Sequence, residues 1–459
     1  MLDTPGCAPV SLVFTYRATR SVIPPPALRQ FQRCVLVALS QTVLLAPEVD
    51  SQTLGANDRR SHLVAATDSL SLAQALERAR IARPQSALAA AGVERARGSA
   101  RLGSLVPNPA AAAQRDDRTP TRQATVTQPL AWLVRRGADA EAGRATVARA
   151  AADSVQLIAD VGREVQRAFY GALAAEERLR LVSEQLRFAD SLVTLADRRV
   201  SAGDISALER DQIAQEASRS RLASAQARAL ARVARVEFAR AVAWERVEPP
   251  RAAGSLANGL DVPAETTFFE RVDPAELMAL PLVRTAVADS AAGAARFRSA
   301  RLAQIPIPAL VAGVEWGSAD ATIVRSRDAR RVTPIVGLSM PLPFWNQGRE
   351  ASAEARGVAL EGAARAAEAR LTAVAALGTA RIRAVETATR ARFARDSLYT
   401  EAIRIRAGAV RLYDAGRTGL LPVLDALRVE RDVALTLVQE LLAFQEARAD
   451  LTALLGQWP

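Results

Sequence analysis

The sequence contains almost none of the residues that most enzymes use for nucleophilic or metal chemistry. Its 459 residues include one histidine, His62, and two cysteines, Cys7 and Cys34, all near the N-terminus. This scarcity argues against a His/Cys metal site, a Ser-His-Asp triad or a Cys-His pair anywhere downstream. An enzyme built on aspartate and glutamate alone stays open, but we expect no enzyme activity, no cofactor and no metal site.

Lysine is absent and aromatic residues are few. All 60 basic residues are arginine, against 49 acidic residues, which gives a formal net charge of +11. Aromatic residues make up 4% of the chain, whereas apolar residues reach 49%, much of it alanine. This composition favours long helices in close contact over bulky globular cores. Acids are interleaved with arginines in stretches such as residues 209–221, which indicates solvated helix faces rather than a nucleic-acid-binding patch.

Residues 34–46 form an apolar run that follows Arg29 and Arg33. The run is too short to span a bilayer as a helix, and its length and basic flank are typical of a secretory signal. We therefore predict that residues 1–66 are a leader that contains an N-terminal extension and this signal. The mature chain would then have no cysteine, which suits an oxidising periplasm. A short buried helix is the alternative interpretation of the same run.

Five sequence landmarks recur in the same order in the two halves of the chain, 197 to 214 residues apart. Internal similarity of this kind indicates a duplicated structural unit. We predict a first repeat at 67–250, a linker at 251–271 and a second repeat at 272–459. The landmarks are Pro84 and Pro281, Pro107–Pro109 and Pro306–Pro308, Gln128–Leu130 and Met340–Leu342, Gly203 and Gly416, and Trp244 and Trp458.

Proline is missing from two long stretches, residues 130–248 and 344–421. Because proline inside a helix costs about 3 kcal/mol, such gaps permit very long helices. Gly203 and Gly416 lie in short polar segments within these stretches, so each stretch predicts a helical hairpin rather than one rod. A partial heptad spacing in the first hairpin, as in coiled coils, is formed by Leu181, Phe188 and Leu195.

Two segments have the alternation of β-strands instead. Residues 309–317 alternate strictly and residues 333–342 follow after a polar loop, which predicts a β-hairpin at about 306–342. A weaker hairpin is predicted at about 107–130. The strands have the length of tilted transmembrane β-strands, although a small soluble sheet capping a helical bundle fits the same pattern.

Four strands cannot close a barrel, and open sheet edges cannot face lipid. If these strands lie in a membrane, several chains must therefore share one barrel. Aromatic residues near strand ends are what the membrane interface favours, although they could equally be packing residues. The candidates are Trp132, Trp316, Phe344 and Trp345.

Five segments resemble the TolC-type outer-membrane efflux proteins, and the resemblance covers about residues 68–458. They are 69–84, 106–109 ("VPNP"), 198–206 ("RRVSAGDIS"), 336–350 ("VGLSMPLPFWNQGRE") and 412–428 ("LYDAGRTGLLPVLDALR"). Segment 336–350 is similar to members that serve heavy-metal and drug resistance-nodulation-division pumps.

The resemblance implies a mainly α fold with a small antiparallel β part. Three chains would each contribute four strands to a 12-stranded barrel in the outer membrane, and the long hairpins would form an α-barrel in the periplasm. The protein would be a passive exit duct for metal ions or small toxic molecules and drugs. Its partners would be a periplasmic adaptor, an inner-membrane resistance-nodulation-division pump and outer-membrane lipid, with no nucleic acid. A periplasmic adaptor or a coiled-coil scaffold protein is the alternative.

The resemblance also assigns candidate site residues. Two helix-reversing turns would meet the adaptor, and Asp425 would form a pore constriction of three symmetry-related carboxylates. Family members can carry a second acid at the position that Pro422 occupies here. The turn residues are Gly203, Asp204, Ile205 and Ser206 in the first repeat and Gly416, Arg417, Thr418 and Gly419 in the second.

Overall fold

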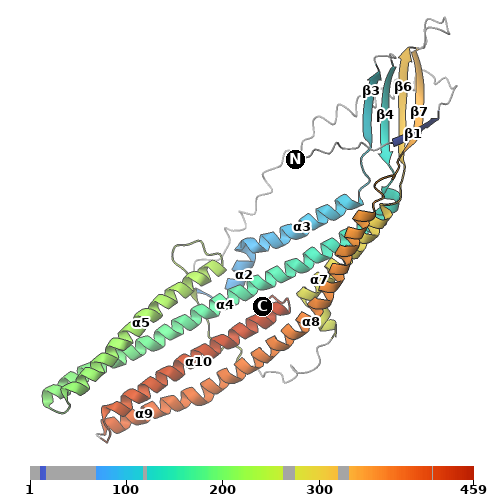
Figure 1. Ribbon diagram of the computed structural model, residues 1–459. Coiled ribbons are helices and arrows are strands. Elements are labelled where there is room, and N and C mark those ends of the chain that lie inside the picture. The colour runs from blue at the N-terminus through green and yellow to red at the C-terminus, as the bar shows by residue number, and fades with distance from the viewer. Residues whose placement is uncertain are drawn as a thin grey trace, which may run out of the picture. The chain divides into compact units, whose positions relative to one another are not determined.

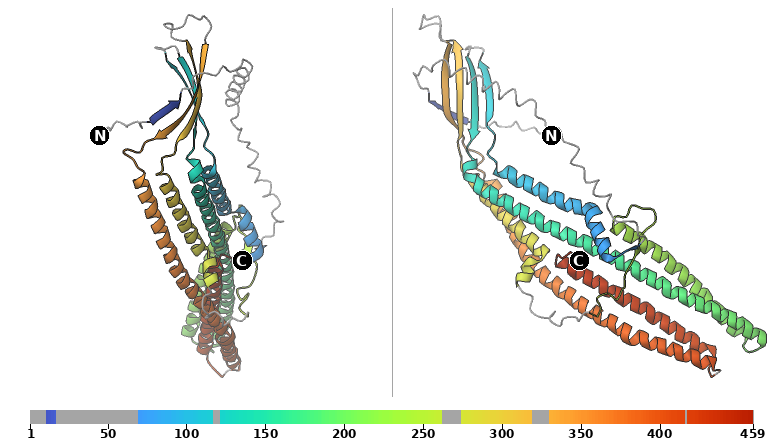
Figure 2. Two further views of the ribbon diagram at one scale, coloured as in Figure 1. Left: turned by 90° about the vertical axis from the view of Figure 1, so that its right-hand side faces the viewer. Right: turned by 180° about the vertical axis from the view of Figure 1, so that it is seen from behind.

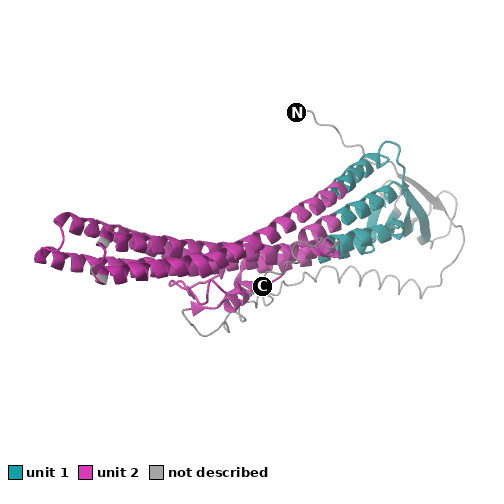
Figure 3. Ribbon diagram, turned by 90° about the horizontal axis from the view of Figure 1, so that it is seen from below, with its two compact units in different colours: residues 1–62, 97–146, 290–362 teal, residues 63–96, 147–289, 363–459 magenta. Residues whose placement is uncertain are grey.

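The computed structural model describes residues 11–16, 69–116, 121–261, 274–318, 330–415 and 417–458, which are mostly helical (Figure 1). The chain divides into two compact units (Figure 3). The sheet unit comprises residues 1–62, 97–146 and 290–362. The helical unit comprises residues 63–96, 147–289 and 363–459.

The sheet unit holds an antiparallel sheet with the strand order β1-β7-β6-β4-β3. The hairpins β3–β4 and β6–β7 fall in the two segments predicted from alternation. A fifth strand was not expected: β1 lies within the predicted leader and pairs with residues 336–341 of β7. The strands are β1 Ser11–Tyr16, β3 Ala110–Asp116, β4 Thr121–Pro129, β6 Ala309–Ser318 and β7 Arg330–Pro341.

Long helices follow each hairpin, as the proline gaps predicted. They are α4 Trp132–Ala202, α5 Ala207–Ala241, α8 Arg349–Phe393, α9 Thr400–Asp414 and α10 Leu420–Leu454, and a single π-helical turn, η3 Ala394–Tyr399, lies between α8 and α9. In the helical unit, α5 runs back along α4 and α10 runs back along α9 (Figure 2). Arg221 of α5 pairs with Asp190 of α4 at 2.7 Å, and Arg406 of α9 pairs with Glu430 of α10 at 2.6 Å.

Shorter helices precede each hairpin: α2 Leu72–Ala82 and α3 Pro84–Ser104 in the first half, and α6 Pro274–Ala279 and α7 Pro281–Leu302 in the second. Pro84 and Pro281 occupy the first position of α3 and α7, where a missing amide proton costs nothing. Two short strands, β2 Ser69–Leu70 and β5 Arg251–Ala252, pair in parallel in the helical unit.

Small residues allow the helices to approach each other closely. A Cβ atom on Gly143 of α4 would lie 2.9 Å from the Cβ atom of Ala100 in α3, closer than normal side chains permit. This contact explains a glycine that lowers helix propensity inside the long helix α4.

The largest apolar cluster of the helical unit includes Phe169 of α4. Its ring makes edge-to-face contacts with Tyr170 and Phe238, at centroid distances of 5.3 and 5.6 Å. Near this cluster, the buried Arg83 pairs with Glu164 at 2.6 Å, and Glu164 also accepts a hydrogen bond from Arg240. Burial alone would raise the pKa of Glu164, but the two arginines hold it below its ordinary value. Loss of Glu164 would leave Arg83 buried and unpaired, which is strongly unfavourable.

Ala243 has a left-handed backbone, with φ at +50°, just after the end of α5. Its carbonyl oxygen accepts a hydrogen bond of 3.2 Å from Arg78, whose guanidinium lies 4.8 Å from the centroid of the Trp244 ring. Trp244 in turn donates from Nε1 to the carbonyl oxygen of Glu248 at 2.8 Å. These contacts hold a conformation that costs an alanine roughly 1–2 kcal/mol.

We predict that Ala243→Gly stabilises the protein by about 1 kcal/mol, because glycine adopts positive φ without a Cβ clash. The matched control is Ala225→Gly at an exposed position inside α5, which should destabilise the protein by about 1 kcal/mol. Thermal unfolding followed by circular dichroism measures both changes. A lower unfolding temperature for Ala243→Gly than for the unaltered protein would show that the left-handed backbone of Ala243 is not strained.

Candidate functional site

One face of the sheet is apolar and exposed. Directly opposite residues of antiparallel strands share a face, so the register sorts the side chains into two sets. Val336 and Leu338, which are 59% and 50% exposed, belong to the apolar set. Its cross-strand pairs between β6 and β7 are Leu310–Leu338, Ala312–Val336, Val314–Pro334 and Trp316–Val332. This face continues onto β4 through Val126, which lies opposite Ala312.

The other face of the same strands is mainly polar or small, apart from Val311 and Ile335. Thr125 lies opposite Gly313, Gln123 lies opposite Glu315, and Glu315 lies opposite Thr333. Gly313 is required sterically, because a Cβ atom there would lie 2.4 Å from the carbonyl oxygen of Ala124. A sheet with one apolar and one polar face is suited to stand between apolar surroundings and water.

The predicted aromatic residues lie near both ends of these strands. Trp132 starts α4 three residues after β4 and is half-buried, whereas Phe344 and Trp345 follow β7 and are exposed. The rings of Phe344 and Trp345 contact each other edge to face at 5.9 Å. Trp316 lies toward the other end of β6, on the apolar face.

The first predicted turn reverses the chain within four residues. α4 ends in a Schellman arrangement, in which the Asp204 amide donates to the Arg199 carbonyl at 2.9 Å and Gly203 has φ at +82°. α5 then begins with a capping box: the Ser206 hydroxyl accepts from the Glu209 amide, and the Glu209 carboxylate accepts from the Ser206 amide. Asp204 is exposed at the tip, whereas Ile205 is half-buried.

The second predicted turn joins α9 to α10. Gly416 lies outside the described residues. On either side of it, the Arg417 amide donates to the Leu412 carbonyl at 2.9 Å, with the same sequence separation as the Asp204–Arg199 bond. Arg417 is exposed, Thr418 is half-buried and Gly419 is the N-cap residue of α10.

The two hairpins contact each other close to their turns. The Arg199 guanidinium of α4 donates a hydrogen bond to the Tyr413 hydroxyl of α9 and lies 4.6 Å from the centroid of that ring. Behind the turns, Leu192 and Ile213 from the first hairpin form a small apolar cluster with Leu424 from α10.

Asp425 lies in the first turns of α10 and its side chain is exposed. One carboxylate oxygen accepts a hydrogen bond of 3.2 Å from Arg428, one helical turn further along. Asp425 also lines a cleft between α5 and α10, together with Gln212 and Arg219 of α5. Pro422, at the position of the absent acid, lies at the start of the same helix.

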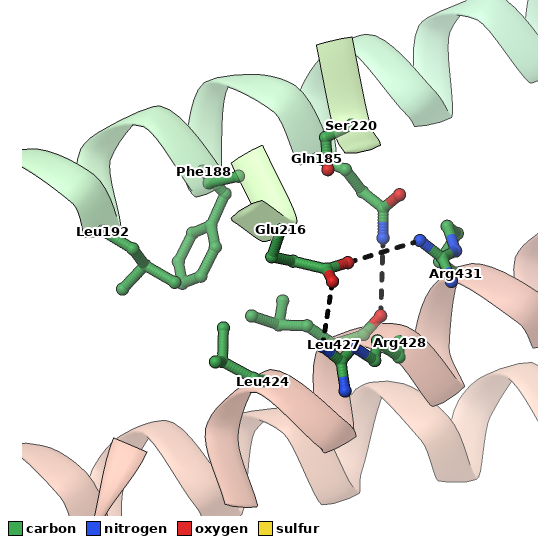
Figure 4. Close-up of a pocket in the computed structure, with 10 residues that line it drawn as sticks. Gln185, Phe188, Leu192, Glu216, Ser220, Leu424, Leu427, Arg428 and Arg431 are labelled. Atoms are coloured by element: carbon green, nitrogen blue, oxygen red, sulfur yellow. Dashed lines mark hydrogen bonds and ion pairs between the residues drawn. The ribbon is translucent and has the colours of Figure 1, made fainter. Parts of the chain in front are cut away.

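A mostly buried carboxylate that the sequence analysis did not identify lines the same cleft. Glu216 of α5 has a side chain that is only 12% exposed, and it points toward α10 (Figure 4). Its oxygens lie 2.9 Å from Arg428 and 3.8 Å from Arg431, and Arg219 on its own helix is also 3.8 Å away. The hydrogen bond to Glu216 raises the pKa of Arg428.

The surroundings of Glu216 bring three helices together. Glu216 also lines a second, smaller pocket. This pocket is lined from α4 by Gln185 and Phe188 and from α10 by Leu424 and Leu427 (Figure 4). Gln185 donates from its side-chain amide to the Leu427 carbonyl oxygen at 3.4 Å. In the sequence, Glu216 is one of several acids in a charge-rich stretch, and no local signal separates it from the exposed ones.

Among the described residues, no group of three or more histidine, cysteine, aspartate or glutamate side chains is arranged to hold a metal ion. None of the helices in the described part of the chain has the length and apolar character needed to cross a membrane.

Residues 277–457 match the family model of the outer membrane efflux proteins. Among curated proteins, the chain is 26% identical over 256 residues to the cobalt-zinc-cadmium resistance protein CzcC of Cupriavidus metallidurans. That match covers 54% of this chain and 57% of the relative, so the chain matches somewhat more than half of the relative's length.

Solved structures share the fold. CusC and the CmeC outer membrane channel of Campylobacter jejuni each match 84% of this chain with a TM-score of 0.69, at 16% and 14% sequence identity. The matches cover 92% of the CusC chain and 86% of the CmeC chain. Together with the family match, these findings confirm the resemblance to the TolC-type outer-membrane efflux proteins.

We predict that Glu216→Gln destabilises the helical unit by about 1–2 kcal/mol, because it removes the charge on which Arg428 and Arg431 converge in a mostly buried setting. The control is Glu401→Gln, which alters an exposed ion pair with Arg404 and should change stability by less than about 0.5 kcal/mol. Denaturant unfolding compares the two variants. Equal effects would show that Glu216 behaves as an ordinary surface charge.

Proposed function

We propose that this chain, which belongs to the TolC-type outer-membrane efflux proteins, is the passive outer-membrane exit duct of a tripartite efflux system. The single observation that carries the proposal is the sheet with one exposed apolar face and one polar face, continued by very long helices. The apolar face would contact lipid and the polar face would line a water-filled lumen.

Closure of the barrel requires more than one chain. The strands β3, β4, β6 and β7 leave edges whose backbone groups cannot remain unpaired in lipid. Three copies in head-to-tail contact would give 12 strands and a closed ring. Because β1 lies within the predicted leader, signal cleavage would remove it and leave the β7 edge to the β3 strand of the next copy.

The helices would extend the duct through the periplasm, and both turns would face the adaptor and the inner-membrane pump. The relative CzcC is a cobalt-zinc-cadmium resistance protein, so we favour divalent metal cations as the exported class. Small toxic molecules and drugs are the second class. In either case we assign substrate selection to the pump and adaptor, and the duct only conducts.

The mass of the protein and the ion selectivity of an Asp425 variant test the proposed duct. We expect the detergent-solubilised mature protein to have the mass of three chains and to form cation-preferring channels in planar bilayers. Asp425→Ala should lower the cation-to-anion permeability ratio about twofold or more, because the lumen loses three carboxylates. Asp432→Ala, an exposed acid two turns further along α10, is the control and should change the ratio less.

Monomeric mature protein that fractionates with soluble envelope proteins would contradict the duct and favour the adaptor or scaffold alternative. Trimeric channels whose selectivity is unchanged by Asp425→Ala would contradict only the pore constriction. In that case Asp425 would act as a carboxylate stabilised near the start of α10 by the helix dipole.

The adaptor-facing turns are tested by charge reversal at exposed positions that leave Gly203 and the capping box intact. Asp204→Arg combined with Arg417→Glu should abolish export and cross-linking to the adaptor, whereas the trimer mass stays unchanged. Arg232→Glu, at an exposed position of α5 away from the turns, is the control. Normal export by the double variant would refute the docking role of the turns.

A further inference from the structure

One carboxylate stands in a row of polar side chains on the polar face of the sheet. Gln123 of β4 lies directly opposite Glu315 of β6, and Glu315 lies directly opposite Thr333 of β7. Gln114 of β3 continues the row, because it lies directly opposite Gln123. Directly opposite residues in antiparallel pairs share a face, so the four side chains lie side by side at one level of the sheet.

The charge of Glu315 has no partner in the chain. Its side chain is half-buried, and its carboxylate forms neither an ion pair nor a hydrogen bond in the part of the chain that the structure describes. Its two opposite neighbours, Gln123 and Thr333, are uncharged. The carboxylate therefore keeps its negative field for whatever lies in front of this face.

Glu315 is also an isolated charge on this face of the described strands. The next three levels toward the helices hold only alanine, threonine, glycine, valine, isoleucine, proline and serine. Asp116 and Arg331 belong to the next level in the other direction, and their formal charges cancel. The polar face thus carries a net negative charge at the level of Glu315.

The proposed assembly would place this charge in a wide ring near the outer opening. Glu315 lies six residues along β6 from Ala309, the end nearer the helices, which is about 20 Å at ~3.4 Å per residue. With four strands per copy, equivalent Glu315 side chains would be about 20 Å apart along the barrel wall, at ~4.8 Å per strand. Carboxylates at this separation cannot bind one ion together, so they would act through their electric field.

We propose that three Glu315 carboxylates attract cations at the outer end of the lumen and help to set the ion preference of the duct; this inference rests on the proposed function. Rings of aspartate or glutamate favour cations in pores. The Debye length is about 30 Å at 0.01 M salt and about 3 Å at 1 M. The three fields therefore overlap across the lumen in dilute salt and are screened in concentrated salt.

The test measures the cation-to-anion permeability ratio of the mature trimer in planar bilayers, at about 0.01 M and at about 1 M salt. Glu315→Gln should lower the ratio about twofold or more in dilute salt and change it little in concentrated salt, because the lumen loses three screened charges. Glu315→Asp keeps the charge and should retain the ratio. The control Glu77→Gln removes an exposed acid from α2, in the helical unit, and should leave the ratio unchanged.

Cysteine substitution tests which face Glu315 occupies in the assembled channel. The predicted mature chain has no cysteine, so Glu315→Cys and the adjacent Val314→Cys would each introduce a single thiol. A negatively charged, membrane-impermeant thiol reagent should restore the cation preference of Glu315→Cys, and a positively charged one should lower it further. Val314→Cys, on the apolar face, should respond to neither reagent. These arms also decide the matter if Glu315→Gln fails to assemble as a trimer.

Equal permeability ratios of Glu315→Gln and the unaltered trimer in dilute salt would overturn the proposal. An effect of Glu315→Gln that is just as large in concentrated salt, or a response of Val314→Cys instead of Glu315→Cys, would overturn it as well. If the unaltered protein forms trimeric channels and any of these results is found, only the role of Glu315 is wrong. If the unaltered protein forms no channel, both the duct and the ring of Glu315 carboxylates are wrong.

Discussion

The backbone groups at the edges of the sheet impose the constraint on which the proposed assembly depends. In the order β1-β7-β6-β4-β3, strand β3 has a neighbour on one side only. The apolar face across β4, β6 and β7 requires apolar surroundings, yet lipid offers no partner for an unpaired amide or carbonyl group. A sheet of this kind is stable in a membrane only when other copies complete it. α4 and α8 follow directly from β4 and β7 in the chain. In the proposed assembly, a ring of sheets therefore requires the helices that follow them to form a ring as well.

The composition of the helices is consistent with that requirement. Long helices that pack side by side over many turns need small residues at their contacts, and alanine supplies them while keeping high helix propensity. The close approach of Gly143 to Ala100 is the extreme case. The largest apolar cluster, which includes Phe169, and the nearby pair of Arg83 with Glu164 bury larger groups in the helical unit near the start of α2 and the end of α5. Many other arginines and acids form ion pairs on exposed helix faces, as Arg180 does with Glu177 and Glu184.

Local signals predicted those parts of the fold that are determined locally. Pro84 and Pro281 start helices, Gly203 adopts positive φ, and strict alternation marks β6. The parts that were missed depend on register or on tertiary packing. The row of Gln123, Glu315 and Thr333 follows from the pairing of β6 with β4 and β7, which alternation alone does not determine. Glu216 is distinguished from neighbouring acids only by the approach of α10, and the pairing of Ser11–Tyr16 with β7 has no counterpart in its local sequence.

Glu216 and Asp425 both interact with Arg428, and this arginine could neutralise the charge of Asp425 at the proposed constriction. One of its nitrogens lies 2.9 Å from Glu216 and another lies 3.2 Å from Asp425. The Glu216 side chain is 12% exposed and that of Asp425 is 63% exposed, so solvent screens the attraction to Asp425 far more. Arg428 is therefore held mainly by Glu216, and Asp425 keeps most of its negative field for the solvent. A constriction with one acid per chain can retain its cation preference for this reason, even though Pro422 replaces the second acid, because the buried carboxylate of Glu216 holds the nearest arginine.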